Sequence, residues 1–121
     1  MKIIKFEELE CWKEARILVR MIYDLIDSKC FSKDYRLIDQ INGAGISVMN
    51  NIAEGFDSQS NKEFMRFLRI ARRSTSEVQS CLYIAIDQDY INNTSFDKLY
   101  AQSDKVRKII DGLIRYLKSK L

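Results

Sequence analysis

Five cationic side chains on one predicted helix are the residues in this sequence whose types and spacing best suit a chemical role. They are Lys62, Arg66, Arg69, Arg72 and Arg73. Four of them recur at steps of four, three and four residues, which places them in a row along one helix face, and Arg72 stands beside that row. Nucleic-acid phosphates also lie along a line of charge, and arginine can contact them through two parallel hydrogen bonds. We call these five residues the cationic ladder, and its pattern predicts electrostatic binding of RNA or DNA.

An ordinary solvated helix face is the second interpretation of the same row, with its cations paired to acidic residues of a neighbouring subunit. The sequence alone favours this plainer interpretation, and the net charge of +3 is by itself weak evidence for a polyanionic partner. No aromatic residue interleaves the ladder, so we do not expect stacked bases or sequence-specific reading of a single strand. Aromatic residues elsewhere occupy helical positions typical of core or interface packing: Trp12, Tyr23, Tyr83, Tyr90 and Tyr100.

The residue types available argue against catalysis and against a metal site. The chain has no histidine, which removes the commonest general base and a common metal ligand. It also lacks the glycine-rich phosphate loops and the nucleophile elbow. Glu54, Glu63 and Glu77 have structural interpretations. Glu54 ends a helix near Asn51 and Ser60, and Glu63 belongs to a helix cap. Glu77 lies on the Ser74 side of its helix, where it can pair with an arginine or accept a polar hydrogen bond within the bundle. We therefore expect no enzyme, no cofactor and no metal ion.

The three cysteines and the hydropathy pattern indicate the cellular compartment. Cys11, Cys30 and Cys81 form an odd set without Cys-x-x-Cys spacing, which is typical of packing thiols in a reducing cytosol. The N-terminus has no apolar core of a signal peptide, and no apolar run approaches the roughly 20 residues that cross a bilayer. These features predict a soluble cytoplasmic protein without membrane contact.

Four amphipathic segments must position the ladder. With no proline and only four glycines among 121 residues, long uninterrupted helices are possible. Apolar residues at alternating steps of three and four predict helices over about residues 8–27, 35–54 and 61–88, and a fourth that begins at a cap on Thr94 or Ser95. No segment shows the alternation of a strand. The pattern predicts an all-α, antiparallel up-down-up-down four-helix bundle that forms a single domain over residues 1–121.

The joint between the second and third helices is the best defined. Gly55 is predicted to end the second helix in the left-handed conformation that glycine adopts easily. Ser60 with Glu63 predicts a capping box, in which each side chain accepts a hydrogen bond from the other residue's N–H. The intervening residues 56–59 are too few for anything but a tight reversal, so these two helices must be antiparallel.

Small and apolar residues outside the main stripes suggest further contacts. Gly43, Ala44 and Gly45 lie in the middle of the second helix, where glycine costs roughly 1 kcal/mol relative to alanine. Either a neighbouring helix or subunit approaches closely there, or a weak helix tolerates them. A second apolar set favours self-association: Ile17, Met21, Ile46, Met65, Ile70, Ile84, Ile109, Ile114 and Tyr116.

Residues spread over most of the chain match the pattern of a known protein family. The matching residues are Phe6-Glu7-Glu8-Leu9-Glu10-Cys11-Trp12-Lys13 with Ala15, Ile22-Tyr23, Tyr35-Arg36-Leu37 with Gln40, Ser47, Asn51-Ile52-Ala53-Glu54-Gly55, Ser60, Glu63-Phe64, Phe67-Leu68, Ile70-Ala71-Arg72, Ser74 and Glu77. The Asn-Ile-Ala-Glu-Gly run followed by Ser-x-x-Glu-Phe is the most specific combination. The sequence resembles the bacterial four-helix-bundle proteins encoded in intervening sequences of 23S ribosomal RNA genes. The accessory protein of diversity-generating retroelements is related to them and shares the fold.

The resemblance implies an antiparallel four-helix bundle that assembles as a homo-oligomer, typically a ring of five subunits, with no known catalysis. For the retroelement relatives it implies a basic surface that binds nucleic acid and a reverse-transcriptase partner; for the intervening-sequence relatives it implies no assigned role. Two departures concern charge. Asn42-Gly43 stands where the family usually has an arginine pair, and Arg73 stands where it often has a glycine before Ser74.

Two functions of different classes therefore stay open at the level of sequence. The first is a non-enzymatic, cytoplasmic, homo-oligomeric bundle, pentameric by resemblance, that binds RNA or DNA electrostatically. The alternative is a structural module that recruits a protein partner through its second apolar set and does not bind nucleic acid. Salt dependence separates them, because phosphate contacts weaken steeply with salt and apolar contacts do not.

Overall fold

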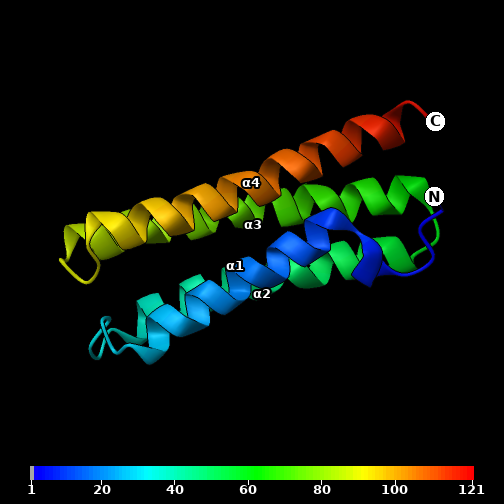
Figure 1. Cartoon of the computed structure of the whole chain (residues 1–121). Coiled ribbons are helices and arrows are strands. Elements are labelled where there is room, and N and C mark those ends of the chain that lie inside the picture. Colours follow the sequence, from blue (N-terminus) through cyan, green and yellow to red (C-terminus); the bar gives the residue numbers. More distant parts are fainter. Residues whose placement is uncertain (1) are drawn as a thin grey trace.

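The computed structural model describes residues 2–121 as an all-α four-helix bundle, which confirms the predicted fold class (Figure 1). A short 3₁₀ turn, η1 (Phe6–Glu8), precedes the helices α1 (Glu10–Asp27), α2 (Tyr35–Asp57), α3 (Asn61–Asp87) and α4 (Asn93–Lys118). No strand occurs in this part of the chain. None of the helices over residues 2–121 is both long enough and apolar enough to cross a membrane.

The four helices form a closed ring of neighbours. Each helix packs against the next one along the chain, and α4 packs back against α1. Figure 1 shows the α1–α2 and α3–α4 joints at one end of the bundle, and the α2–α3 corner with both chain ends at the other. The ladder helix α3 therefore has α2 on one side and α4 on the other, and its remaining face points outward.

The α2–α3 corner differs from the prediction at Gly55. α2 continues through this glycine to Asp57, and the left-handed residue is Gln59, with a φ of 58°. Gly55 instead lies at a close helix crossing, since a Cβ atom there would stand 2.7 Å from Phe67 Cβ and 3.0 Å from Phe64 Cδ1. The prediction that Gly55 ends the helix in a left-handed conformation is wrong, because close packing rather than backbone conformation requires the glycine.

Side-chain caps start the later helices. Ser60 Oγ accepts a hydrogen bond from the Glu63 N–H at 3.2 Å, as predicted. The reciprocal half of the capping box is replaced, because the Glu63 carboxylate binds Arg66 and the Ser60 N–H donates to Ser58 Oγ at 3.4 Å. The cap of α4 differs from the predicted Thr94 or Ser95. Asn92 Oδ1 accepts from the Ser95 N–H at 2.8 Å and so begins the helix earlier.

The core consists of two apolar clusters separated by small polar residues. One cluster fills the end with the α2–α3 corner, and the other fills the end with the two remaining joints. Between them lie Ser47, Ser74, Thr75 and Ser103, which we call the polar layer. Ser47 Oγ and Ser74 Oγ are 2.9 Å apart, and Ser103 Oγ donates to the Thr75 carbonyl at 3.0 Å. The layer therefore joins α2 to α3 and α3 to α4 through satisfied hydrogen bonds.

Close approach explains only one of the two glycines in the middle of α2. A Cβ atom on Gly45 would lie 2.7 Å from Ile22 Cδ1 of α1, whereas the corresponding position on Gly43 has no atom of another helix within 4 Å among residues 2–121. The hypothesis of a neighbouring helix therefore holds at Gly45. Gly43 faces open space, which fits the other interpretation, a tolerated weak point in the helix.

The second apolar set divides between core and surface. Met65 and Ile114 are buried and belong to the core. Ile17, Ile84 and Tyr116 are 45%, 47% and 57% exposed, while the remaining members are half-buried: Met21, Ile46, Ile70 and Ile109. The exposed apolar surface is thus smaller than the sequence indicates, and it is spread over three helices.

Candidate nucleic-acid interface

All five residues of the cationic ladder are exposed on α3. The helix buries Phe64, Leu68 and Ala71 on the opposite face, and this burial turns the ladder outward. From Lys62 to Arg73 the row spans 11 residues, or roughly 16 Å at 1.5 Å per residue. The predicted row of charge is therefore present as one continuous stripe.

Arg66 is held by its neighbours on the same helix. Its Nη2 and Nε atoms each lie 3.1 Å from an oxygen of the Glu63 carboxylate, and its guanidinium carbon lies 4.5 Å from the centre of the Phe67 ring. The hydrogen bond from Arg66 lowers the pKa of the Glu63 carboxyl. Both side chains are about half exposed, so the pair contributes little stability and can be exchanged for a phosphate contact.

Arg72 reaches sideways to α4, where its Nε donates to Asp111 Oδ1. Arg69, Arg72 and Arg73 line a surface depression of about 350 Å³ together with Asp111 and Ile114. Within residues 2–121, Arg69 and Arg73 form no ion pair, and neither does Lys62 at the start of the row. Three of the five ladder cations are therefore available to an external anion.

The remaining motif residues have structural positions and do not form a second site. Ser74 is buried in the polar layer, and Asn51 Nδ2 extends that layer by donating to the Ser47 carbonyl at 2.8 Å. Glu54 and Glu77 are exposed, and neither has an ion-pair partner in the described residues. The arginine partner that the sequence suggested for Glu77 is thus not formed there.

Carboxylates and thiols do not combine into reactive or metal-binding groups. Glu63 and Glu77 are 14 residues apart on one helix, or roughly 21 Å, and residues 2–121 contain no group of His, Cys, Asp and Glu side chains that could hold a metal ion. Cys11, Cys30 and Cys81 are all free. Burial raises the pKa of the Cys11 thiol to about 12 and also raises the pKa of Cys81, which keeps both thiols protonated and unreactive.

One group of surface residues was missed by sequence reasoning. Tyr83 was assigned to core or interface packing, but it is 53% exposed and contacts Phe96 and Tyr100 of α4. The signal was present in α3, where Tyr83 follows Arg69 and Arg72 along one edge at helical spacing. The α4 partners could not be found in this way, because they join the group only through the fold.

Comparison with known proteins gives a family match and a match in fold. Residues 7–112 match the family model described as 23S rRNA-intervening sequence protein. The fold is similar to the crystal structure of a protein of unknown function from the S23 ribosomal protein family of Bacteroides thetaiotaomicron VPI-5482. The TM-score is 0.80 at 23% identity, over 86% of this chain and 97% of that chain, and at such identity the likeness concerns the fold alone. No curated protein matches the sequence.

Proposed function

We propose a function for this chain from the premise that it belongs to the 23S rRNA-intervening sequence protein family: it is a non-enzymatic, cytoplasmic, homo-oligomeric bundle that binds RNA or DNA electrostatically. The observation that carries this proposal is the row of exposed cations on α3, three of which have no ion pair within residues 2–121. The absence of an enzymatic role rests on the lack of histidine and on the separation of the carboxylates.

The number of available cations sets the expected strength of binding. On duplex DNA the logarithm of the affinity falls by about 0.9 per neutralised phosphate for each unit in the logarithm of salt concentration, and on single strands by about 0.7. If three cations contact a single strand, the slope of log affinity against log salt concentration should be about −2, and if all five contact a duplex it should be about −4.5. With so few phosphate contacts, a single subunit would bind nucleic acid weakly.

Self-association would multiply this weak site. The exposed apolar residues Ile17, Ile84 and Tyr116 support an interface between copies, and the family resemblance implies a ring of five. A symmetric ring repeats the ladder and raises the effective affinity for a long polyanion. The mass of the protein in solution, measured by light scattering, tests this part: a mass near five subunits supports the ring, and a monomer rules it out.

A charge-matched pair of variants tests the ladder itself. Binding of a fluorescent RNA or DNA is measured by anisotropy over a series of salt concentrations. Replacing Arg66, Arg69 and Arg73 by glutamine should abolish binding and leave the mass and helicity unchanged. The control replaces three exposed cations of α1, a helix that does not pack against α3, and removes the same charge from another face: Lys13→Gln, Arg16→Gln and Arg20→Gln. If wild type and the ladder variant bind the RNA or DNA with equal affinity, the proposal is wrong.

The alternative function is a module that recruits a protein partner without nucleic acid. The same exposed side chains, Ile17, Ile84 and Tyr116, favour it. Binding that persists at high salt and is lost on replacing Ile84 by a polar residue would favour this alternative. Binding that disappears with salt and depends on the ladder favours the first proposal.

A further inference from the structure

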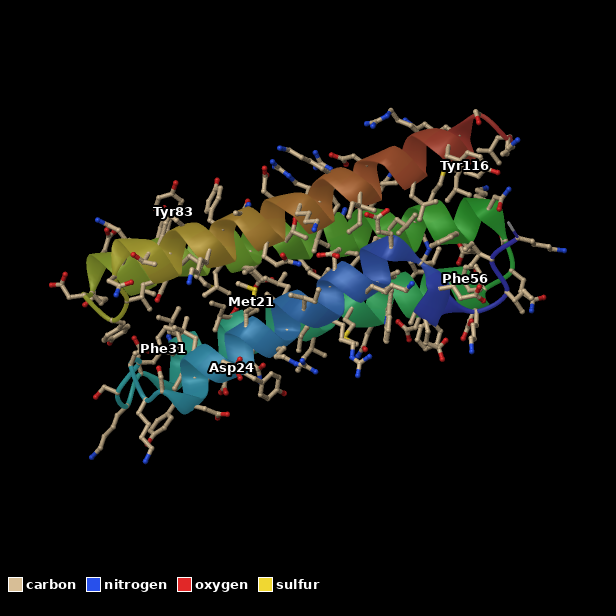
Figure 2. All side chains as sticks on the ribbon, viewed as in Figure 1. Met21, Asp24, Phe31, Phe56, Tyr83 and Tyr116 are labelled. Atoms are coloured by element: carbon tan, nitrogen blue, oxygen red, sulfur yellow. The ribbon has the colours of Figure 1, made fainter. Side chains whose placement is uncertain are left out.

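Three aromatic side chains from two helices meet on the surface between α3 and α4. The centre of the Tyr83 ring lies 5.0 Å from that of Phe96 and 6.0 Å from that of Tyr100, both at steep angles. Phe96 and Tyr100 stack on each other at 5.5 Å with an interplanar angle of 25°. We call these three residues the aromatic group. Tyr83 is more than half exposed and points away from the bundle in Figure 2.

The aromatic group and the cationic ladder share one edge of α3. Positions 69, 72, 76, 79 and 83 follow at steps of three and four residues, so they lie along a single line. This line faces α4 at both ends, where Arg72 binds Asp111 and Tyr83 contacts Phe96. From Arg72 to Tyr83 the line covers 11 residues, or roughly 16 Å, so a short stretch of a linear polymer can contact both ends.

The charges along this edge favour a polyanion on the ladder side of the aromatic group. Asp104 of α4 binds Arg107 and Lys108, and Asp111 binds Arg72. Both carboxylates are thus neutralised by cations of the same edge. With Arg69 and Arg73 included, five cations stand against two carboxylates: Arg69, Arg72, Arg73, Arg107 and Lys108 against Asp104 and Asp111.

Two exposed acidic residues that have no ion-pair partner in the described part of the chain lie beyond the aromatic group. Asp87 follows Tyr83 by one helical turn, Asp97 adjoins Phe96, and both are exposed. These carboxylates repel phosphates past that point. A bound strand would therefore run from the aromatic group towards the ladder and would not continue past the end of α3.

We propose that the α3–α4 edge binds single-stranded nucleic acid, with phosphates on Arg69, Arg72 and Arg73 and an unpaired base stacked on Tyr83. The inference rests on the proposed nucleic-acid binding and adds the strandedness of the ligand and a second class of contact. Bases in a duplex are stacked on each other and cannot reach a side-chain ring, whereas bases of a single strand can. An acidic polypeptide would use the cations but offers no flat ring to Tyr83.

The aromatic contacts of Tyr83 also prepare it for stacking. A tyrosine has few rotatable bonds, and the Tyr83 ring is held against the stacked rings of Phe96 and Tyr100 before any ligand arrives. Little side-chain freedom is then lost on binding, which is the main cost that a flexible surface residue would add. Because stacking depends on the face of the base and not on its hydrogen-bonding edge, the site would accept any sequence.

The test compares two strands of equal charge on the full-length protein. The probes are a fluorescent 12-nucleotide oligothymidine and a strand of equal length in which the bases are replaced by abasic sites, measured by anisotropy at low salt. Wild type should bind the base-bearing strand about fivefold more tightly or better, since one stacked base contributes at least roughly 1 kcal/mol. This comparison needs no variant.

Two variants then locate the effect. Tyr83→Leu keeps an apolar side chain over Phe96 but removes the ring, so it should bind both strands with the affinity that wild type has for the abasic strand. The control is Tyr35→Leu, which removes a ring that is 65% exposed on α2 and should leave the preference intact. Oligouridine should behave like oligothymidine, because the ring faces are alike.

Each of the other possible results contradicts either the stacking site alone or nucleic-acid binding as a whole. Equal binding of the two strands by wild type, or a preference that survives Tyr83→Leu, overturns the stacking site and leaves the ladder proposal in place. Failure of both strands to bind at low salt overturns the nucleic-acid function and the inference together. Polyglutamate that displaces oligothymidine more effectively than unlabelled oligothymidine does, at equal charge concentration, would show that the edge prefers acidic polypeptides.

Discussion

The three glycines of α2 receive the same substitution with three different expected results. Replacing a helical glycine by alanine removes a penalty of roughly 1 kcal/mol and adds one methyl group. At Gly43 that methyl group meets no atom of another helix within 4 Å in the described part of the chain. Gly43→Ala should therefore raise the free energy of unfolding by up to about 1 kcal/mol.

At Gly55 the same methyl group has no room. It would lie 2.7 Å from Phe67 Cβ and 3.3 Å from the Phe64 carbonyl oxygen. These atoms belong to or adjoin the backbone of α3, so they move only if the two helices separate. Overpacking of this kind costs about 1–3 kcal/mol, and the gain in helix propensity leaves a net loss of up to about 2 kcal/mol.

Gly45 should fall between these two cases. Its methyl group would meet Ile22 Cδ1 at 2.7 Å. That atom is the far end of a side chain, but Ile22 is fully buried and has little space to rotate. The loss from packing and the gain from helix propensity should nearly cancel, so Gly45→Ala should unfold close to wild type.

Denaturant unfolding followed by circular dichroism, at one fixed protein concentration, measures the series. The expected order of midpoints is Gly43→Ala above wild type, Gly45→Ala near it, and Gly55→Ala below it. A Gly55→Ala variant as stable as wild type would refute the close crossing of α2 and α3. A destabilised Gly43→Ala variant would refute the open surface at Gly43 and indicate that another subunit covers it.

Three further predictions concern other parts of the bundle. Burial raises the pKa of the Cys11 thiol from 9.0 to about 12. Between pH 9 and pH 12 the thiol is therefore protonated in the folded state and ionised in the unfolded state, and the free energy of unfolding should fall by roughly 1.4 kcal/mol per pH unit. Cys11→Ala should remove that slope in an alkaline unfolding series, and an unchanged slope would assign it to other groups. Phe31→Ala removes a ring that is 1% exposed and packs against Tyr90, so it should cost about 3–5 kcal/mol in thermal unfolding; a small shift would mean that the α1–α2 joint collapses onto the gap. Asn92→Ala removes the cap of α4 and should cost about 1 kcal/mol, whereas Asn92→Asp, which keeps the acceptor, should cost little.

The helices themselves could be predicted from the sequence because their signals are local. Apolar spacing and caps predict the end of α3 within one residue of its observed end at Asp87, and they predict the observed start of α2 at Tyr35. Gly55 shows where local signals fail. Glycine serves either a left-handed backbone or a close contact, and only the position of Phe67 on the next helix distinguishes the two. The end of α2 was therefore placed too early.

Burial along α4 shows a second limit. Leu113 and Ile114 are adjacent and both apolar, and the apolar spacing places Ile114 in the second apolar set, outside the main stripes. The structure buries Ile114 and leaves Leu113 only partly covered. The choice between them depends on how α4 sits between α1 and α3, and this orientation is set by side chains on the other helices.

The candidate site was predictable only in part for the same reason. The ladder is visible because its members lie within 12 residues of one helix. The partner of Arg72 is Asp111 on α4, 39 residues away, and Tyr83 meets its aromatic neighbours only across the α3–α4 contact. A single sequence shows what one helix presents, but not what a neighbouring helix adds to it.

The polar layer has a consequence for how the bundle opens. It lies at mid-length between the two apolar clusters, where α2, α3 and α4 are joined by hydrogen bonds that contribute about 1 kcal/mol each. One end can then open while the other stays closed. Amide hydrogen exchange should show two levels of protection within α2, α3 and α4, with the change near Ser47, Thr75 and Ser103. We therefore expect the cooperative unit of this protein to be half a bundle built from four half-helices, and not a single helix or the whole chain.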